Sequence, residues 1–145
     1  MFSVSREYWF SAAHRIEGHP KCGRLHGHNY QVIVTVKGEI LPTSGMLIDY
    51  GELDKIVKPI VDEMDHRYIV SHSNREAGDD YAMLAQNKGD IFHLDAPAST
   101  GEYLAAYFWK RILDALWESA YVITRQDLIV MVAETPKSTA TYLAD

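Results

Sequence analysis

The first part of the chain carries the pattern of two β-strands. Residues 2–13 are rich in Phe, Val, Tyr and Trp and alternate loosely between apolar and polar positions, while residues 29–36 alternate more regularly. An alternation with a period of two is typical of strands with one buried face. The residues between them, 15–27, contain three glycines and a proline and predict a loop. We therefore expect an antiparallel strand pair joined by a loop long enough to carry function.

Two helices are predicted further along. Apolar side chains recur at helical spacing over residues 53–64, where Asp49 is a suitable N-cap. Pro59 lies inside this segment and is expected to kink or interrupt the helix. A second apolar stripe at helical spacing runs from residue 101 to about residue 119.

The remaining segments complete the predicted fold. Residues 71–98 are polar and weakly periodic and predict a long loop or insertion, which could contain a short strand at 90–94. The chain closes with two predicted strands, 128–134 and 138–143, joined by a tight turn. The order ββααββ predicts one α+β domain over residues 1–145, with a four-stranded antiparallel sheet and both helices on one face.

Composition and charge narrow the class of protein. The chain has 145 residues, 47% of them hydrophobic, which matches an ordinary globular domain. Its net charge of −6 argues against a nucleic acid or an anionic membrane as partner. No run approaches the roughly 20 apolar residues of a membrane span, and Arg6 and Glu7 interrupt the stretch where a signal peptide would need apolar residues. We expect a cytoplasmic protein with no membrane partner.

The histidines form the clearest chemical pattern. His26 and His28 are two residues apart at the start of a predicted strand, so their side chains face the same way. His14 ends the preceding strand and can meet them if the two strands pair. Three imidazoles without a fourth protein ligand would leave an open position on Zn²⁺, as in catalytic sites. The alternatives are a solvated or hydrogen-bonded histidine cluster, and a closed structural site that includes Cys22 as the fourth ligand.

Two further groups could move protons. Cys22 is the only cysteine, and a nearby cation would make its thiolate available as a base or nucleophile near neutral pH. Otherwise it is an inert buried thiol. Asp65 directly precedes His66, and a carboxylate in that place can orient an imidazole and raise its basicity. The alternative for His66 is a histidine at a helix C-terminus, where the helix dipole favours it.

A third set of residues is suited to binding. Glu134 ends an apolar strand, and a carboxylate there could accept two hydrogen bonds from an amidine-like pair of N–H groups on a ligand. The alternative is a solvated strand end. Thr100 and Glu102 are typical of the N-cap and first turn of a helix.

Several motifs occur together and in order along the chain. They are F-S-A-A-H at 10–14, C-G-R-L-H-G-H-N-Y at 22–30, G-M-L-I-D-Y at 45–50, D-H at 65–66, S-T-G-E at 99–102 and A-E-T at 133–135. With these motifs the chain resembles the family of 6-pyruvoyl-tetrahydropterin synthase and 6-carboxytetrahydropterin synthase, over nearly all residues except about 71–98.

The resemblance implies a fold, an assembly and a cofactor. It implies the tunnelling fold, in which subunits join their sheets into a β-barrel, usually as a hexamer of two trimers with active sites between subunits. It implies 7,8-dihydroneopterin triphosphate as the substrate, and a Zn²⁺ ion that His14, His26 and His28 hold and that binds the side-chain hydroxyls of the substrate.

The resemblance also implies roles for the other residues. Cys22 is similar to the proton acceptor at the substrate side chain. His66, oriented by Asp65, is similar to a proton relay contributed by the neighbouring subunit. Glu134 is similar to the pterin anchor, which also takes part in the relay. Thr100 and Glu102 are expected close to the pterin ring, and Lys21 and Arg24 are candidate phosphate contacts whose alternative is ordinary solvated charge.

The compact K-C-G-R-L-H-G-H block is more similar to the 6-carboxytetrahydropterin branch, a lyase that releases acetaldehyde and triphosphate in queuosine biosynthesis. The alternatives are a 6-pyruvoyl-tetrahydropterin synthase, a non-catalytic pterin- or purine-binding protein of the same fold, and an unrelated zinc hydrolase.

Three departures from the family pattern stand out. The dyad is followed by R-Y-I-V without the family's Asn. Gly101 and Tyr103 replace residues that are commonly Thr, Ser or Ala, and Asn. Residues 71–98 are longer than the expected connection and could form a lid or decorate the oligomer.

Overall fold

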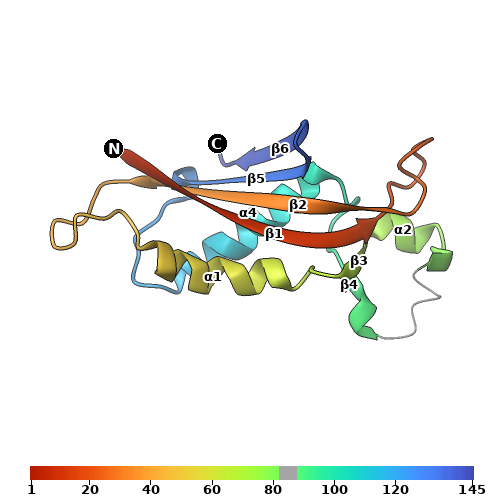
Figure 1. Cartoon of the computed structure of the whole chain (residues 1–145), viewed down its shortest axis with the longest axis horizontal. Helices are drawn as coiled ribbons and strands as arrows, with labels where there is room; N and C mark the ends of the chain where they lie inside the picture. Colours follow the sequence, from red (N-terminus) through yellow and green to blue (C-terminus); the bar gives the residue numbers. More distant parts are fainter. Residues whose placement is uncertain (82–87) are drawn as a thin grey trace.

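The computed structural model describes residues 1–81 and 88–145, and in them one curved mixed sheet has the strand order β4-β3-β1-β2-β5-β6 (Figure 1). The strands are β1 (Phe2–His14), β2 (His26–Gly38), β3 (Arg67–Val70), β4 (Ile91–His93), β5 (Leu128–Thr135) and β6 (Ser138–Leu143). The helices are α1 (Tyr50–Asp62), the short α2 (His72–Glu76) and α4 (Gly101–Trp117), with 3₁₀ turns at Lys88–Asp90 and Arg125–Asp127.

The central pair, β1 and β2, sets the geometry of the sheet. The two strands pair antiparallel along their full length, from Phe2 opposite Gly38 to His14 opposite His26. Because side chains alternate between the faces of a strand, the even-numbered residues of both strands point to one side. From Tyr8 onward this row of β1 is buried against the helices, as is the row of β2 from Tyr30 to Val36.

The four predicted strands and the two predicted helices are confirmed, and two short strands extend the sheet. β3 pairs parallel with β1 at Ala12 and Ala13, and β4 pairs parallel with β3, so the sheet is mixed and six-stranded in the described residues. The purely antiparallel four-stranded sheet predicted above is therefore wrong in this respect. β3 has four residues, and its buried Ile69 and Val70 are adjacent, so it has no alternation to detect.

Residues 71–98 are more ordered than a loop. They contain α2, and the short strand expected at 90–94 is confirmed as β4, while residues 82–87 lie outside the described part. The family pattern expects an Asn shortly after the Asp65–His66 dyad. In this chain that position lies within β3, because the chain enters the sheet directly after His66.

Both long helices cover the same face of the sheet and contact each other (Figure 1). The N-cap prediction is confirmed, since the Asp49 carboxylate accepts from the amides of Gly51 and Glu52 at 2.7 and 3.2 Å. Pro59 does not interrupt α1, which stays helical to Asp62. No helix in the described residues is long and apolar enough to cross a membrane.

Replacement of Phe108 by alanine is expected to destabilise the protein strongly. Phe108 is fully buried on α4 and meets Phe10 edge-to-face, with ring centroids 5.6 Å apart. The loss of such a side chain costs about 3–5 kcal/mol. Phe2→Ala is the matched control, because Phe2 is 55% exposed, and it should cost below about 1 kcal/mol. Denaturant unfolding measures both, and equal losses would contradict this description of the core.

Candidate metal centre and its pocket

The helix-facing row of the central strand pair ends in three histidines. His14 lies directly opposite His26, and His28 lies opposite Ala12, so the three rings stand side by side on one face. Their ring centroids are 4.6 to 5.2 Å apart, and one ligand nitrogen from each ring lies within 4.8 Å of the others. The structure therefore brings together the three ligands predicted from the sequence.

Hydrogen bonds fix how two of the rings are presented. The Nδ1 of His14 lies 2.8 Å from the carbonyl oxygen of Ser99, and the Nδ1 of His26 lies 2.7 Å from that of Arg24. Because a carbonyl can only accept, both Nδ1 atoms carry a proton, and both Nε2 atoms keep a free lone pair. This arrangement is typical of histidines that bind metal through Nε2.

Two nitrogens of the cluster are buried without a hydrogen bond. Among the described residues, the Nε2 atoms of His14 and His28 lie below the surface and have no hydrogen-bond partner. The only charged groups recorded beside them are the oxygens of Glu134, at 3.9 and 4.0 Å. Leaving buried nitrogens unpaired is costly. Together with an imidazole nitrogen of His26, these two nitrogens fit a bound Zn²⁺ ion, which readily accepts three nitrogen ligands.

Burial also keeps these rings in the form that binds metal. Burial lowers the pKa of His14 to about 4, and the two neighbouring histidines lower it further. The hydrogen bond to the Ser99 carbonyl opposes this shift, because it favours the protonated ring. Burial and the nearby His26 lower the pKa of His28 as well. Both rings are therefore neutral at pH 7, and neutral imidazole is the ligand for a metal ion.

A pocket of about 300 Å³ opens beside His14 and His26. The predicted Cys22, Glu134, Thr100 and Glu102 all line it. Burial raises the pKa of Glu134, and the nearby charge of Glu102 raises it further, while His26 opposes the shift. The structure thus gathers the candidate binding residues and the candidate base around one cavity.

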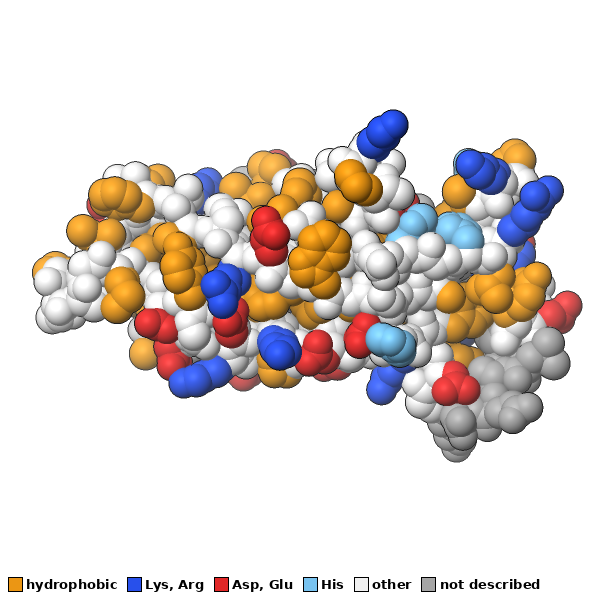
Figure 2. All heavy atoms as spheres, viewed as in Figure 1, with side chains coloured by type: hydrophobic (Ala, Val, Ile, Leu, Met, Phe, Trp, Pro, Cys, Tyr) orange, Lys and Arg blue, Asp and Glu red, His pale blue; other side chains and the backbone are white. Residues whose placement is uncertain are grey.

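The loop between β1 and β2 places Cys22 at this pocket by folding back on itself. The carbonyl oxygen of Cys22 accepts from the amide of Ile16 at 2.7 Å, and the amide of Cys22 donates to His19 Nδ1 at 2.9 Å. Gly23 makes the fold possible, since a Cβ there would lie 2.5 Å from the His19 carbonyl oxygen. Lys21 and Arg24 are exposed on this loop, outside the described pocket lining. Figure 2 shows Lys and Arg side chains projecting from the loop beside a group of histidines.

Close packing against β6 explains why a glycine suits position 101. It is buried where α4 begins, and an added Cβ would lie 3.3 Å from the Cβ of Ala140 on β6. The small residue lets the first turn of α4, which carries Thr100 and Glu102 to the pocket, approach β6 closely.

The dyad lies on a different surface. Asp65 Oδ2 is 2.9 Å from His66 Nδ1, so the predicted pair is formed, and Asp65 Oδ1 accepts from the amide of Ser11 at 2.9 Å. The His66 side chain is 81% exposed. It lines a shallow depression with His28 and Asn29, apart from the pocket of Cys22. Within one chain the dyad and the pocket are therefore separate.

Sequence reasoning missed the groups that hold the ligands. The carbonyl oxygens of Ser99 and Arg24 belong to the backbone, and no side-chain pattern signals a backbone acceptor. The buried Tyr30 hydroxyl was missed for another reason, since it belongs to a residue that the strand pattern assigns to the core. The Tyr30 ring lies 5.3 to 5.8 Å from the rings of His28 and His14, and the hydroxyl has no recorded partner in the described chain.

The fold and the three-histidine pocket define the class of protein. The sequence profile of the 6-pyruvoyl tetrahydropterin synthase family matches residues 3–145, and the chain belongs to this family. It is 38% identical over 118 residues to the putative 6-carboxy-5,6,7,8-tetrahydropterin synthase of Methanocaldococcus jannaschii, covering 74% of this chain and 72% of that protein. It is 32% identical over 117 residues to the 6-carboxy-5,6,7,8-tetrahydropterin synthase of Haemophilus influenzae, covering 77% and 82%.

A solved structure agrees with the fold. The 6-pyruvoyl tetrahydropterin synthase of Caenorhabditis elegans superimposes with a TM-score of 0.72 at 27% identity, over 99% of this chain and 96% of that one. The sequence-based expectation of the tunnelling fold is thereby confirmed.

Zinc is expected to stabilise the protein, and His26→Ala is expected to abolish that effect. A ligand at about 100 times its dissociation constant adds about 2.7 kcal/mol to the free energy of unfolding. Loss of a direct ligand should weaken zinc binding by more than about 100-fold, beyond the range for outer-shell partners. His93→Ala, at an exposed histidine on β4, is the control and should bind zinc like the wild type. Calorimetric titration and thermal unfolding with and without chelator measure both effects.

The Asp65→Asn variant is expected to lose stability in a pH-dependent way. The Ser11 amide, helped by His66 and opposed by burial, holds the pKa of Asp65 below its usual value of 3.8. A lowered pKa contributes stability above the unfolded-state pKa, and this contribution disappears as the pH falls through the folded-state pKa. The variant should therefore be less stable than the wild type at pH 7 and approach it below about pH 4.

The matched control is Asp114→Asn, whose carboxylate makes an exposed ion pair with Lys110 at 2.8 Å. Exposed ion pairs contribute little, so this variant should change stability only slightly at any pH. Denaturant unfolding at a series of pH values distinguishes the two, and parallel curves for both variants would contradict the role assigned to the Ser11 amide.

Proposed function

We propose that this protein is a zinc-dependent lyase that converts 7,8-dihydroneopterin triphosphate to 6-carboxy-5,6,7,8-tetrahydropterin, releasing acetaldehyde and triphosphate, in queuosine biosynthesis. The observation that carries the proposal is the cluster of His14, His26 and His28, open on the side of a pocket that also contains Cys22 and Glu134. The names of the relatives from M. jannaschii and H. influenzae support the choice of product.

Binding of the pterin is assigned to Glu134. Its carboxylate lines the pocket and would accept two hydrogen bonds from the amidine-like N–H pair of a pterin ring, an arrangement that is strong for a charged acceptor. Burial and the charge of Glu102 raise its pKa, so the carboxylate gains from a donor pair that stabilises its charge. Thr100 and Glu102, which line the same pocket, would lie close to the ring.

Proton transfer is assigned first to Cys22. Its half-buried thiol faces the same pocket as two of the histidines and would accept a proton from the substrate side chain as a thiolate. When bound, Zn²⁺ would supply the Lewis acidity that makes the substrate hydroxyls more acidic and polarises a developing carbonyl. Cys22 is thus the base, and the three histidines are the ligands, which leaves the site open for substrate.

The dyad would come from a neighbouring subunit. His66 and Asp65 lie on a separate surface of the chain. Because the His66 side chain is exposed there, it could enter the pocket of another copy. We therefore propose a homo-oligomer, a hexamer built as a dimer of trimers, in which the sheets join into barrels and His66 completes the site next door. Lys21 and Arg24, exposed on the loop that carries Cys22, are the proposed contacts of the triphosphate. A cytoplasmic location fits these proposals and stays a prediction.

A second candidate is the 6-pyruvoyl product. It is favoured by the 30% identity over 146 residues, 92% of this chain, to the putative 6-pyruvoyl tetrahydrobiopterin synthase of C. elegans. In that reaction triphosphate is eliminated and the carbon side chain is retained, so the two candidates differ in whether a carbon–carbon bond breaks.

The deciding experiment is to incubate the zinc-loaded protein with 7,8-dihydroneopterin triphosphate, trap released aldehydes and identify the pterin product by mass spectrometry. We expect acetaldehyde and a 6-carboxy pterin. A 6-pyruvoyl product without acetaldehyde would replace the first candidate by the second. Unchanged substrate with zinc still bound would point to a pterin- or purine-binding protein, and turnover of an unrelated ester or amide would point to a hydrolase.

The Cys22→Ala variant is expected to keep zinc and to lose turnover by about 10²–10⁴-fold, the usual contribution of a general base. Lys21→Ala, on the same loop, is the comparison and should raise KM more than it lowers kcat. A Cys22→Ala protein that loses zinc as well as stability would instead identify a closed four-ligand structural site.

A further inference from the structure

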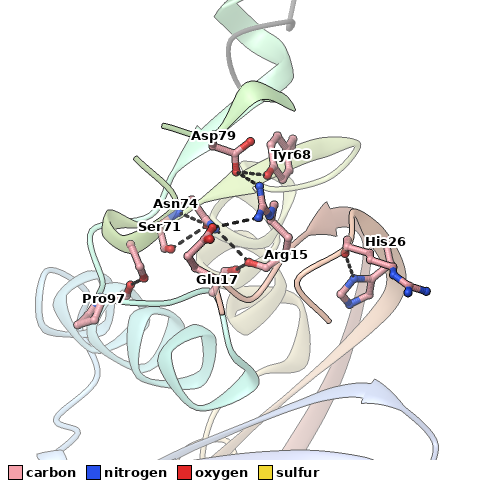
Figure 3. Close-up of polar contacts among 11 residues, drawn as sticks. Arg15, Glu17, His26, Tyr68, Ser71, Asn74, Asp79 and Pro97 are labelled. Carbon is pink, nitrogen blue, oxygen red and sulfur yellow. Dashed lines mark hydrogen bonds and ion pairs between the residues drawn. The ribbon is translucent and has the colours of Figure 1, made fainter. Parts of the chain in front are cut away.

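The buried polar side chains of the described residues are concentrated in one place. Besides His14, they are Ser71, Asn74, Asp79 and Ser99, all at most 4% exposed. Three of the four belong to the segment 71–98, and Ser99 directly follows it. Figure 3 shows Ser71, Asn74 and Asp79 around Arg15, the residue next to His14. A polar cluster of this kind needs a reason, because buried polar groups cost stability unless they are hydrogen-bonded.

The cluster is connected to the His14 ring by hydrogen bonds. The Asn74 side chain donates through Nδ2 to the carbonyl oxygen of Arg15 at 3.3 Å, and the Ser99 hydroxyl donates to the same oxygen at 3.3 Å. The Ser99 carbonyl oxygen in turn accepts from His14 Nδ1 at 2.8 Å. Asn74 and Ser99 therefore meet at the backbone of the residue after His14, and Ser99 holds the ring itself.

Asn74 is itself fixed in place by the start of α2. Its Oδ1 accepts from the amide and the hydroxyl of Ser71 at 3.1 and 2.8 Å, which uses the acceptor end of the side chain and leaves the amide end pointing at Arg15. The first turn of α2 is also bound to the residues that follow β4, because the amides of His72 and Ser73 donate to the carbonyls of Ala96 and Pro97. The Asn74 side chain is therefore fixed by Ser71, and the helix that carries it is fixed by residues 96–97.

The side chain of Arg15 is held by two carboxylates. It lies 3.1 Å from Glu17 and 3.8 Å from the buried Asp79, which also accepts a hydrogen bond from the Tyr68 hydroxyl on β3 (Figure 3). The carbonyl oxygen of Arg15 thus contacts Asn74, and its guanidinium lies beside Asp79, which in turn is bonded to Tyr68 on β3. Both ends of the residue next to His14 are fixed by the same part of the chain.

We propose that Asn74 and Ser99 are positioning residues of the metal centre, which hold His14 in the orientation and protonation pattern that direct its Nε2 to the ion. The inference rests on the three-histidine metal site proposed above. It gives Asn74, in the described part of the segment 71–98, a task in supporting the ligand His14, while a lid or a contact in the oligomer stays a separate prediction. Outer-shell partners of this kind fix the ring orientation of metal-bound histidines.

The test measures metal binding by the purified full chain. Asn74→Ala removes the donor to the Arg15 carbonyl, and it is expected to weaken zinc binding about tenfold, the lower end of the range for outer-shell partners. The visible absorption bands of the Co²⁺-loaded protein report the geometry of the ligands, and they should shift in position or intensity. A residue with only a structural role would lower stability and leave these bands unchanged.

The matched control is Tyr8→Phe. Tyr8 is buried on β1 and its hydroxyl donates to Asp54 at 2.9 Å, so the variant also loses a hydrogen bond between a largely buried side chain and its partner, but away from His14. It should bind zinc like the wild type and give the wild-type Co²⁺ bands. Should Asn74→Ala fail to fold, Ser99→Ala removes one hydrogen bond while keeping the carbonyl, and zinc binding weaker than in the wild type is expected.

The outcomes are distinguishable. Asn74→Ala or Ser99→Ala with weaker zinc binding and altered Co²⁺ bands, next to an unchanged Tyr8→Phe, supports the inference. Folded variants with wild-type zinc affinity and wild-type bands overturn it and leave the proposed function untouched. A wild-type protein that binds neither ion overturns the proposed function and the inference together.

Discussion

The structure depends on the pairing of β1 with β2, and above all on its register. His14 stands opposite His26, and the side-chain period of two then places His28 on the same face. A shift of one residue would turn every side chain of one strand to the other face. The long run of paired residues from Phe2 to His14 fixes that register, because the buried valines and aromatics of the row can face the helices in only one alignment. The metal centre is the last part of the same row.

This origin explains how the cluster can be largely buried and still offer free nitrogens to a ligand. The row that packs against α4 ends in imidazoles, so the same burial that forms the core lowers the pKa of His14 and keeps it neutral. Neutrality supplies the lone pairs that a metal needs. Within the described residues the buried Nε2 atoms of His14 and His28 have no hydrogen-bond partner, and a bound metal ion would use their lone pairs. Fold and site thus come from one requirement, burial of a regular face.

The sequence predicted the parts of the molecule that carry a period or a motif. Strand alternation and the helix stripes were sufficient for the four strands and the two helices, and the spacing of His26 and His28 with His14 at the preceding strand end was sufficient to predict that the three histidines meet. The short β3 was missed because four buried residues show no alternation. The Ser99 carbonyl was missed because a backbone acceptor has no side-chain signature, and Asn74 because a single buried amide in a polar segment has none either. The separation of His66 from the pocket of its own chain follows from the three-dimensional path of the chain, and its expected role in a neighbouring subunit stays a prediction.

The buried polar network near His14 illustrates what apolar packing cannot do. Methyl groups tolerate small shifts against one another, so a hydrophobic contact stabilises a segment without fixing its position closely. Hydrogen bonds have narrow ranges of distance and angle, and a network of them specifies where each group lies. Ser71, Asn74 and Ser99 form such a network with the backbone of Arg15 and the ring of His14, which is the place where the direction of a nitrogen lone pair would matter for a bound metal ion. The position of these polar groups beside His14 is what a demand for the orientation of that ring would produce.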